Sequence, residues 1–168
     1  IEKAYLIRRL PAFYTNAKKR LVKSPKVYVR DSGMVHYLIG LTSMDQLLGH
    51  GVVGTSWEGF VIEQVISVTQ NQYGYYYYRT QDQTECDLVL VKGGLPIAGI
   101  EAKLSAAPKQ TKSFTNSIQD LGTKYNYIIT PKCEQAYSLS DRIMVCGVGD
   151  FLENHLPQLA AWLPTYHS

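Results

Sequence analysis

Cysteine is scarce in this chain of 168 residues, which contains only Cys86, Cys133 and Cys146. The number is odd and no Cys-x-x-Cys pair occurs, so the sequence predicts neither a disulfide framework nor a zinc site. No apolar run approaches the roughly 18 residues that a membrane-spanning helix needs, and no signal peptide is visible. We therefore expect a cytoplasmic protein with no membrane partner.

Two familiar kinds of catalytic pattern are also missing. The histidines have neither the spacing of a metal ligand set nor that of a catalytic triad, so we expect ordinary surface or packing roles for His36, His50, His155 and His167. No Gly-x-x-x-x-Gly-Lys-Ser/Thr motif occurs, so any ATPase activity belongs to sequence outside this chain. Because the first residue is Ile1 rather than Met, we expect a piece of a longer protein.

What is present is typical of a folded domain, since 45% of the residues are hydrophobic and 18% are charged. The charge is unevenly distributed. The first 30 residues contain nine basic side chains and one acidic one, a net charge of +8, whereas the whole chain carries +3. Such a segment predicts contact with a polyanion, most simply nucleic acid; a solvated basic surface is the alternative. The residues expected to bind nucleic acid are Arg8, Arg9, Lys18, Lys19, Arg20, Lys23, Lys26 and Arg30.

Hydrophobic periodicity predicts an alternating order of elements. We expect a helix over residues 56–70, strands over 75–79, 85–91 and 97–103, a helix over 109–121, strands over 125–130 and 142–146, and a helix capped by Asp150. On the first of these helices Glu58 shares the apolar face and points inward or toward a cleft, while Glu63 points to water.

Charged residues interrupt two of the expected strands, in the stretch TECDLVLVKGGLPIAGIEAKL. If this hairpin turns around Gly94, paired residue numbers sum to 188, so Asp87 faces Glu101 and both share a face with Lys103. Two adjacent carboxylates repel unless a proton or a cation lies between them. Mg²⁺ is the natural occupant because it takes oxygen ligands and often binds substrate phosphate.

In this interpretation the remaining charges also have roles. Lys103 orients or helps to deprotonate the attacking water and offsets charge on the phosphate, and Glu58 supplies a further ligand. The alternative is an ordinary half-exposed hairpin in which Lys103 pairs with Glu85 across the strands.

The set of Glu58 on a helix, Asp87 on a strand and Glu101-Ala102-Lys103 on the next strand resembles the PD-(D/E)xK nuclease superfamily. The resemblance implies an α/β, restriction-endonuclease-like core in which a mixed sheet is flanked by helices, in the order helix-strand-strand-strand-helix-strand. It also implies that Asp87 and Glu101 hold Mg²⁺, which Mn²⁺ can replace, and that Lys103 assists the water.

A closer resemblance covers nearly the whole chain. AYLIRRLP, KRLVKSPKVYVRDSGMVHYLIG, ECDLVL and IEAK are similar to the C-terminal domain of unknown function in prokaryotic AAA-type ATPases. The resemblance implies a basic winged-helix remnant and linker over residues 1–45, a nuclease-like domain over 46–168 and an upstream ATPase module. We expect a Mg²⁺-dependent nuclease acting on DNA. The alternatives are a noncatalytic module that binds DNA or protein and a module that assembles an ATPase homo-oligomer.

Overall fold

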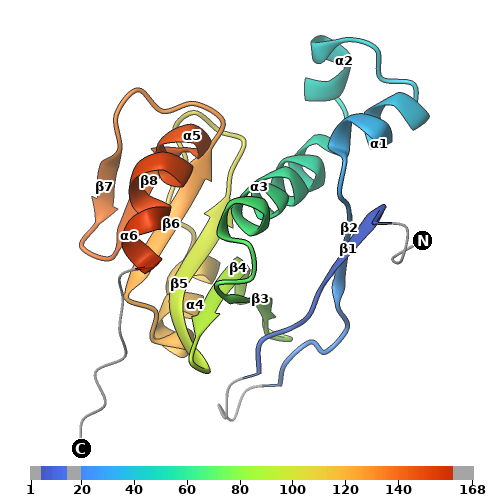
Figure 1. Ribbon diagram of the computed structural model, residues 1–168. Helices are drawn as coiled ribbons and strands as arrows, with labels where there is room; N and C mark the ends of the chain where they lie inside the picture. The colour runs from blue at the N-terminus through green and yellow to red at the C-terminus, as the bar shows by residue number, and fades with distance from the viewer. Residues whose placement is uncertain (1–4, 15–19, 161–168) are drawn as a thin grey trace, which may run out of the picture.

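The computed structural model describes residues 5–14 and 20–160 (Figure 1). Its elements, in chain order, are β1 (Ile7–Leu10), β2 (Lys26–Val29), α1 (Ser32–Leu38), α2 (Met44–Leu48), α3 (Val53–Thr69), β3 (Gly74–Arg79), β4 (Glu85–Lys92), β5 (Leu95–Ala102), α4 (Lys112–Leu121), β6 (Tyr125–Thr130), β7 (Tyr137–Ser140), β8 (Ile143–Gly147), α5 (Val148–Asp150), the π-helical turn η1 (Phe151–His155) and α6 (Leu156–Ala160). The expected order from the first long helix to the fourth strand is confirmed as α3-β3-β4-β5-α4-β6.

The body of the molecule is a mixed sheet of six strands in the order β3-β4-β5-β6-β8-β7. The pairs β5–β6 and β6–β8 are parallel, and the other three pairs are antiparallel. The sequence did not predict β7, which is only four residues long and half exposed. A short strand with a mixed pattern of burial carries little periodic signal.

Helices cover both faces of this sheet. On one face, α3 and the α5-η1-α6 segment bury a cluster that includes Val65, Leu88, Ile100 and Phe151 (Figure 1). On the other face, α4 buries a second cluster that includes Phe114. The chain therefore forms a three-layer mixed α/β fold, and the burial of both sheet faces explains the nearly continuous apolar runs of the central strands.

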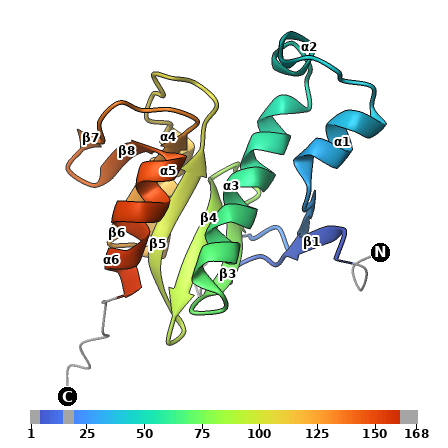
Figure 2. The same cartoon turned by 45° about the horizontal axis from the view of Figure 1, so that its top comes forward.

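The N-terminal residues form a two-stranded ribbon to one side of the sheet (Figure 2), in which β1 pairs with β2 in antiparallel fashion (Figure 1). The chain after β1 lies along the edge strand β3, where Phe13 N donates to Tyr77 O at 2.7 Å and Tyr77 N donates to Pro11 O at 3.0 Å. The ribbon segment thus covers an edge that would otherwise expose unpaired backbone groups. Beyond it, α1 and α2 bury none of their residues.

Two expectations about individual carboxylates were wrong. Glu63 does not point to water: it is buried on α3, with 8% of its surface exposed, because the ribbon packs on that side of the helix. The side chain of Asp150 makes no capping hydrogen bond, since the helical segment starts earlier, at Val148 with Gly147 as the N-cap, and Asp150 before η1 is already helical. Among the described residues, no helix has both the length and the apolar character needed to cross a membrane.

Candidate functional site

The β4–β5 hairpin has the predicted register near its charged residues. Leu88 pairs with Ile100, and Val89 pairs with Gly99, as the sum of 188 requires. The turn itself differs from expectation. It contains only Gly93 and Gly94, both with positive φ, and a bulge in the hairpin shifts the pairing by one residue. The tight turn and the bulge together give the register that a wider turn around Gly94 would give.

A second irregularity in β4 decides where Asp87 points. Tyr76 pairs with Val89 and Tyr78 pairs with Cys86, so the single residue Tyr77 lies opposite two residues of β4. Such a β-bulge interrupts the alternation of side chains. Val89 packs in the α4 cluster, whereas Asp87 turns to the other face, where its Oδ1 lies 3.4 Å from Lys26 Nζ.

The bulge separates the charged residues that the sequence placed on one face. Ile100 packs against the α3 side of the sheet, and alternation puts the next residue, Glu101, on the α4 side. There Glu101 accepts a hydrogen bond from Thr111 Oγ1, at the N-cap of α4, at 3.3 Å. Asp87 remains linked to the same strand end, because its Oδ2 accepts a hydrogen bond from the backbone N–H of Ala102 at 3.0 Å.

Lys26 of β2 occupies the centre of the carboxylates on the α3 side. Its Nζ lies 2.7 Å from Glu58 Oε1, 2.6 Å from Glu85 Oε1 and 3.4 Å from Asp87 Oδ1. Tyr28, two residues further along the same strand, donates a hydrogen bond from its hydroxyl to Glu58. The residue that the sequence assigned to nucleic-acid binding is thus an internal cation.

Lys103 pairs with Glu101, Nζ to Oε1, at 2.7 Å. The alternative cross-strand pair with Glu85 does not form, since Glu85 is engaged by Lys26 and, at 3.8 Å, by Arg79. Burial acts to lower the pKa of Lys103, but the hydrogen bond with Glu101 and the charges of Glu101, Asp87 and Glu58 outweigh it and raise that pKa. Lys103 therefore stays protonated at neutral pH.

The carboxylates of this region outnumber its lysines. Glu58, Glu85, Asp87 and Glu101 face the ammonium groups of Lys26 and Lys103, with Arg79 only at the rim.

This excess of negative charge contributes to a raised pKa of Asp87. Burial and the charge of Glu58 raise the pKa of Asp87 to about 7, although Lys26 and the N–H of Ala102 oppose the shift. Burial likewise raises the pKa of Glu101, against the effect of Lys103. A positive charge added near Asp87 would be stabilised strongly.

Two further residues of the basic segment also form ion pairs within the fold. Arg8 Nη2 donates to Glu63 Oε2 at 3.1 Å, and Arg30 Nε donates to the same oxygen at 2.9 Å. These pairs fasten the ribbon to α3. The pKa of Glu63 is lowered because hydrogen bonds from both arginines outweigh the opposing effect of burial.

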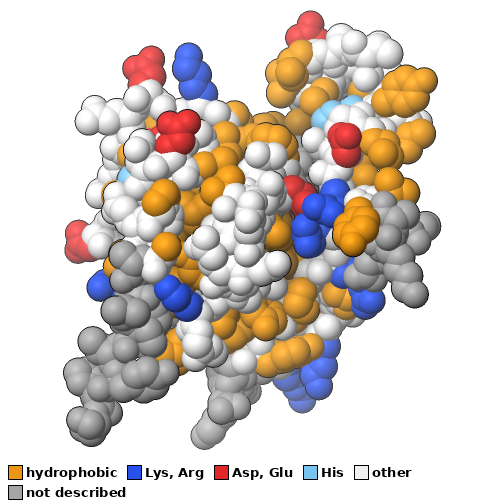
Figure 3. Space-filling model, in the orientation of Figure 1, with side chains coloured by type: hydrophobic (Ala, Val, Ile, Leu, Met, Phe, Trp, Pro, Cys, Tyr) orange, Lys and Arg blue, Asp and Glu red, His pale blue; other side chains and the backbone are white. Residues whose placement is uncertain are grey.

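The rest of the predicted nucleic-acid-binding set is on the surface or outside the described residues. Arg9, Arg20 and Lys23 are exposed. Lys18 and Lys19 lie outside the described residues. On the face shown in Figure 3, the visible Lys and Arg side chains stand in separate small groups. Part of the positive charge of the N-terminal segment is therefore neutralised by ion pairs within the fold.

The sequence did not predict two of the side-chain clusters that the structure contains. Lys26 was recognised only as part of a basic run, and nothing in the sequence links it to carboxylates 32 to 61 residues away. Among the described residues, the group of three or more potential metal ligands whose ligand atoms all lie within 4.8 Å of one another is Cys146, Asp150 and His155. The carboxylates Glu58, Asp87 and Glu101 do not come together this closely.

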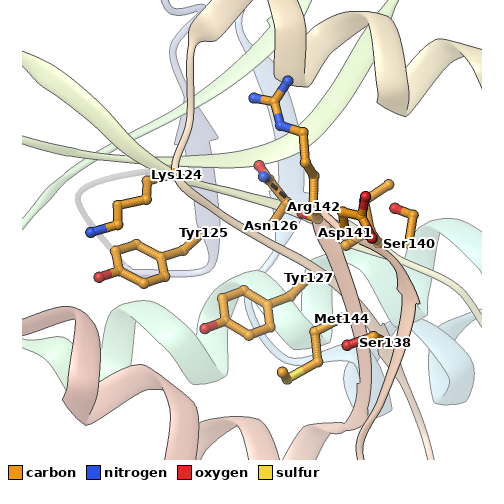
Figure 4. Close-up of a pocket in the computed structure, with 10 residues that line it drawn as sticks. Lys124, Tyr125, Asn126, Tyr127, Ser138, Ser140, Asp141, Arg142 and Met144 are labelled. Carbon is orange, nitrogen blue, oxygen red and sulfur yellow. Dashed lines mark hydrogen bonds between the residues drawn. The ribbon is translucent and has the colours of Figure 1, made fainter.

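One hollow of the surface lies away from the carboxylates of the β4–β5 hairpin. A hollow of about 150 Å³ between β6 and the β7–β8 hairpin is lined by ten residues and contains none of the predicted site residues (Figure 4). Inside it, the side-chain amide of Asn126 donates to the carbonyl of Arg142 at 3.0 Å, which ties the hairpin to β6. This hollow is open to solvent, and we assign it no function.

Comparison with known proteins places the chain in a family. The sequence model of a domain of unknown function, DUF4143, matches residues 53–151, and that of a second domain of unknown function, DUF8612, matches residues 1–45. Uncharacterized proteins of Mycobacterium bovis and Mycobacterium tuberculosis are each 35% identical over 149 residues, which is 89% of this chain. The chain spans about a third of the length of these relatives (33%), and no solved structure matches it. It belongs to the DUF4143 domain family.

Proposed function

We propose that this chain is the nuclease-like module of a prokaryotic AAA-type ATPase and that it hydrolyses phosphodiester bonds of DNA with the help of Mg²⁺. The observation that carries the proposal is the excess of partly buried carboxylates over lysines at the bulged end of the β4–β5 hairpin. Helix α3 and the bulged strand β4 place Glu58, Glu85 and Asp87 together around Lys26, at a cost in folding free energy.

The donor set suits a hard divalent cation, because every candidate ligand is a carboxylate. Asp87 and Glu58 would hold the cation, whereas Glu101, on the α4 side of the sheet, would position Lys103. Mg²⁺ bound there would activate water for attack and neutralise charge on the phosphate. Since Lys26 already lies among Glu58, Glu85 and Asp87, the lysine and a metal ion compete for the same carboxylates.

Lys103 has the role of a charged donor in this proposal. Its pKa is raised, so the ammonium holds its proton and is a poor base. The side chain of Lys103 is 38% exposed, so it is accessible to substrate while Glu101 holds it in place. Donation of N–H bonds from Lys103 to a non-bridging phosphate oxygen would stabilise the charge that develops there during attack.

DNA would be held by the exposed basic residues Arg9, Arg20 and Lys23 of the N-terminal segment, which borders the carboxylates through Lys26. Contacts of this kind are electrostatic and independent of sequence. The ATPase module would lie in the remaining length of the longer protein, because the mycobacterial relatives are about three times as long as the matched region.

The test is cleavage of end-labelled single- and double-stranded DNA and RNA in Mg²⁺ or Mn²⁺ by the wild type, Asp87→Asn and Lys103→Met. We expect metal-dependent cleavage of DNA that falls at least roughly 100-fold in both variants. Lys132→Met, which changes an exposed lysine, is the matched control and should cleave like the wild type. Cleavage that survives both substitutions, or a wild type inactive on all four substrates, would rule out this proposal.

A second function is favoured by Lys26 itself. An ammonium held by three carboxylates gives a stable fold without metal, as in a noncatalytic module that binds DNA or a protein partner. Inactive wild type that still binds DNA, with an affinity that falls steeply as salt is added, would support this second function.

A further inference from the structure

The last helical segment of the described chain begins beside three side chains with different donor atoms. Cys146 ends the apolar part of β8, Asp150 ends α5, and His155 ends η1. The thiol sulfur, one carboxylate oxygen and one ring nitrogen all lie within 4.8 Å of one another. None of these residues belongs to the carboxylate site at the β4–β5 hairpin, so this group stands apart from the proposed function.

The distance between two of the donors matches a tetrahedral metal site. His155 Nε2 lies 3.3 Å from Asp150 Oδ2. Zinc binds nitrogen at about 2.0–2.1 Å and carboxylate oxygen at about 2.0–2.2 Å, which places two tetrahedral ligands about 3.3–3.5 Å apart. A single ion can therefore contact both atoms without a large change of position.

The third donor, Cys146, differs from the other two cysteines. Cys86 Sγ donates to the carbonyls of Leu88 and Ile100, and Cys133 Sγ donates to that of Gln135. Cys146 is fully buried, and within the described part of the chain its sulfur has no hydrogen-bond partner. A buried polar atom without a partner, close to two other ligand atoms, is expected where an ion completes the site.

The backbone and neighbouring side chains orient the other two donors. In an α-helix, residues three or four apart face each other, but the π-helical turn η1 brings Asp150 and His155 together although they are five apart. Asn154 Nδ2 donates to Asp150 Oδ1 at 2.8 Å, which leaves Oδ2 to face the imidazole. The ring of Tyr127 packs against that imidazole, with 5.6 Å between ring centroids. Such supporting contacts are typical of metal ligands.

We propose that Cys146, Asp150 and His155 bind a borderline-soft divalent transition metal, best represented by Zn²⁺, with a fourth position open to water. Mixed sulfur, nitrogen and oxygen donors favour zinc over magnesium, which takes oxygen ligands. A thiolate and a carboxylate together neutralise the charge of the ion, and the thiol proton leaves to solvent on binding. The ion fastens the α5-η1-α6 segment to β8.

The experiment is a titration of the reduced, metal-free chain with Co²⁺ and then with Zn²⁺. Co²⁺ should produce a thiolate-to-metal charge-transfer band and the intense visible bands of tetrahedral cobalt, and one equivalent of Zn²⁺ should abolish both. Cys146→Ser and His155→Gln should each weaken Zn²⁺ binding by roughly 100-fold. Cys133→Ser and His36→Gln are matched controls, since they change a thiol and an imidazole outside the group, and should bind like the wild type.

The pattern of results decides between this site and an ordinary imidazole–carboxylate ion pair. A Co²⁺ complex without a charge-transfer band, or no complex at all, overturns the proposal. So does Zn²⁺ binding that Cys133→Ser or His36→Gln weakens as much as Cys146→Ser does. Circular dichroism identifies a variant that fails to fold, and the cobalt bands of the wild type together with His155→Gln then decide the result. Mg²⁺ should leave the cobalt spectrum unchanged whether or not the chain cleaves DNA.

Discussion

Lys26 Nζ lies 2.7 Å from Glu58 Oε1, so the N-terminal ribbon inserts a positive charge among the carboxylates of α3 and β4. Glu85 and Asp87 share the same ammonium at 2.6 Å and 3.4 Å. The side chains of Lys26 and Glu58 are each 19% exposed, which makes these contacts stronger than those of a surface ion pair. Replacing Lys26 should therefore change both the stability of the fold and its binding of metal ions.

Replacing Lys26 by Met should lower the stability of the metal-free protein and raise its affinity for Mn²⁺. Without divalent metal, three carboxylates lose their shared cation, and the free energy of unfolding should fall by about 3 kcal/mol. Affinity for Mn²⁺ should instead rise at least about 10-fold, because the ion no longer displaces an ammonium. Urea denaturation in EDTA and calorimetric titration with Mn²⁺ measure the two quantities.

The matched control for this variant is Lys23→Met, which removes an exposed lysine of the same segment. It should change neither quantity appreciably. If Lys26→Met binds Mn²⁺ no more tightly than the wild type, the lysine and the metal do not compete. If neither protein binds Mn²⁺, the carboxylates are no metal site.

Asp87→Asn should stabilise the metal-free protein as the pH rises. The pKa of Asp87 is raised to about 7, so between its ordinary value near 4 and pH 7 the folded state holds a proton that the unfolded state has lost. Stability contributed by this group is therefore present below pH 4 and decreases as the pH approaches 7. Asn keeps an oxygen for the N–H of Ala102 and carries no charge, so the variant lacks this loss.

Urea denaturation in EDTA at pH 5 and pH 8 checks this dependence. The variant should gain on the order of 1 kcal/mol over the wild type between the two pH values. A constant difference would show that Asp87 titrates normally. Asp82→Asn, on an exposed turn, is the control and should show no such gain.

Glu63→Gln should have the opposite pH dependence. The pKa of Glu63 is lowered by Arg8 and Arg30, so its stabilising effect is present above its ordinary pKa near 4.5 and is lost as the pH falls. At pH 7 the variant should lose about 3 kcal/mol, since two partly buried arginines lose their partner. The difference from the wild type should shrink toward pH 3. An equal loss at pH 3 and pH 7 would assign the effect to packing.

Gly59→Ala tests the contact of the ribbon with α3. A Cβ at this position would lie 3.1 Å from Tyr28 Cδ1, which is too close unless the ribbon shifts. We expect a loss of about 1–2 kcal/mol. Gly54→Ala, on the same helix with nothing within 4 Å, should be neutral or stabilising by up to about 1 kcal/mol. Thermal denaturation of the two variants compares them directly, and equal effects would contradict close packing at Gly59.

Local sequence patterns were sufficient to predict the main helices and strands and the register of the central hairpin. Strand β6 occupies the predicted residues Tyr125–Thr130, and the pairing of Val89 with Gly99 follows from counting across a glycine turn. The prediction from strand alternation was wrong for the side chain of Asp87. A bulge in β4 opposite Tyr77 reverses its direction, and the sequence of one strand does not indicate such a bulge dependably. The burial of Glu63 was missed for a related reason, since its partners Arg8 and Arg30 are distant in sequence.

The sequence by itself determined the α/β class, the order of elements and the chemical identity of the charged residues, because these follow from periodicity and side-chain type. Only the tertiary structure decided which charges meet. It turned Asp87 toward Lys26, separated it from Glu101 and brought Cys146 to Asp150 and His155. The physical reason is that a buried charge or thiol is stabilised by whatever the fold places beside it, and sequence spacing does not specify those neighbours.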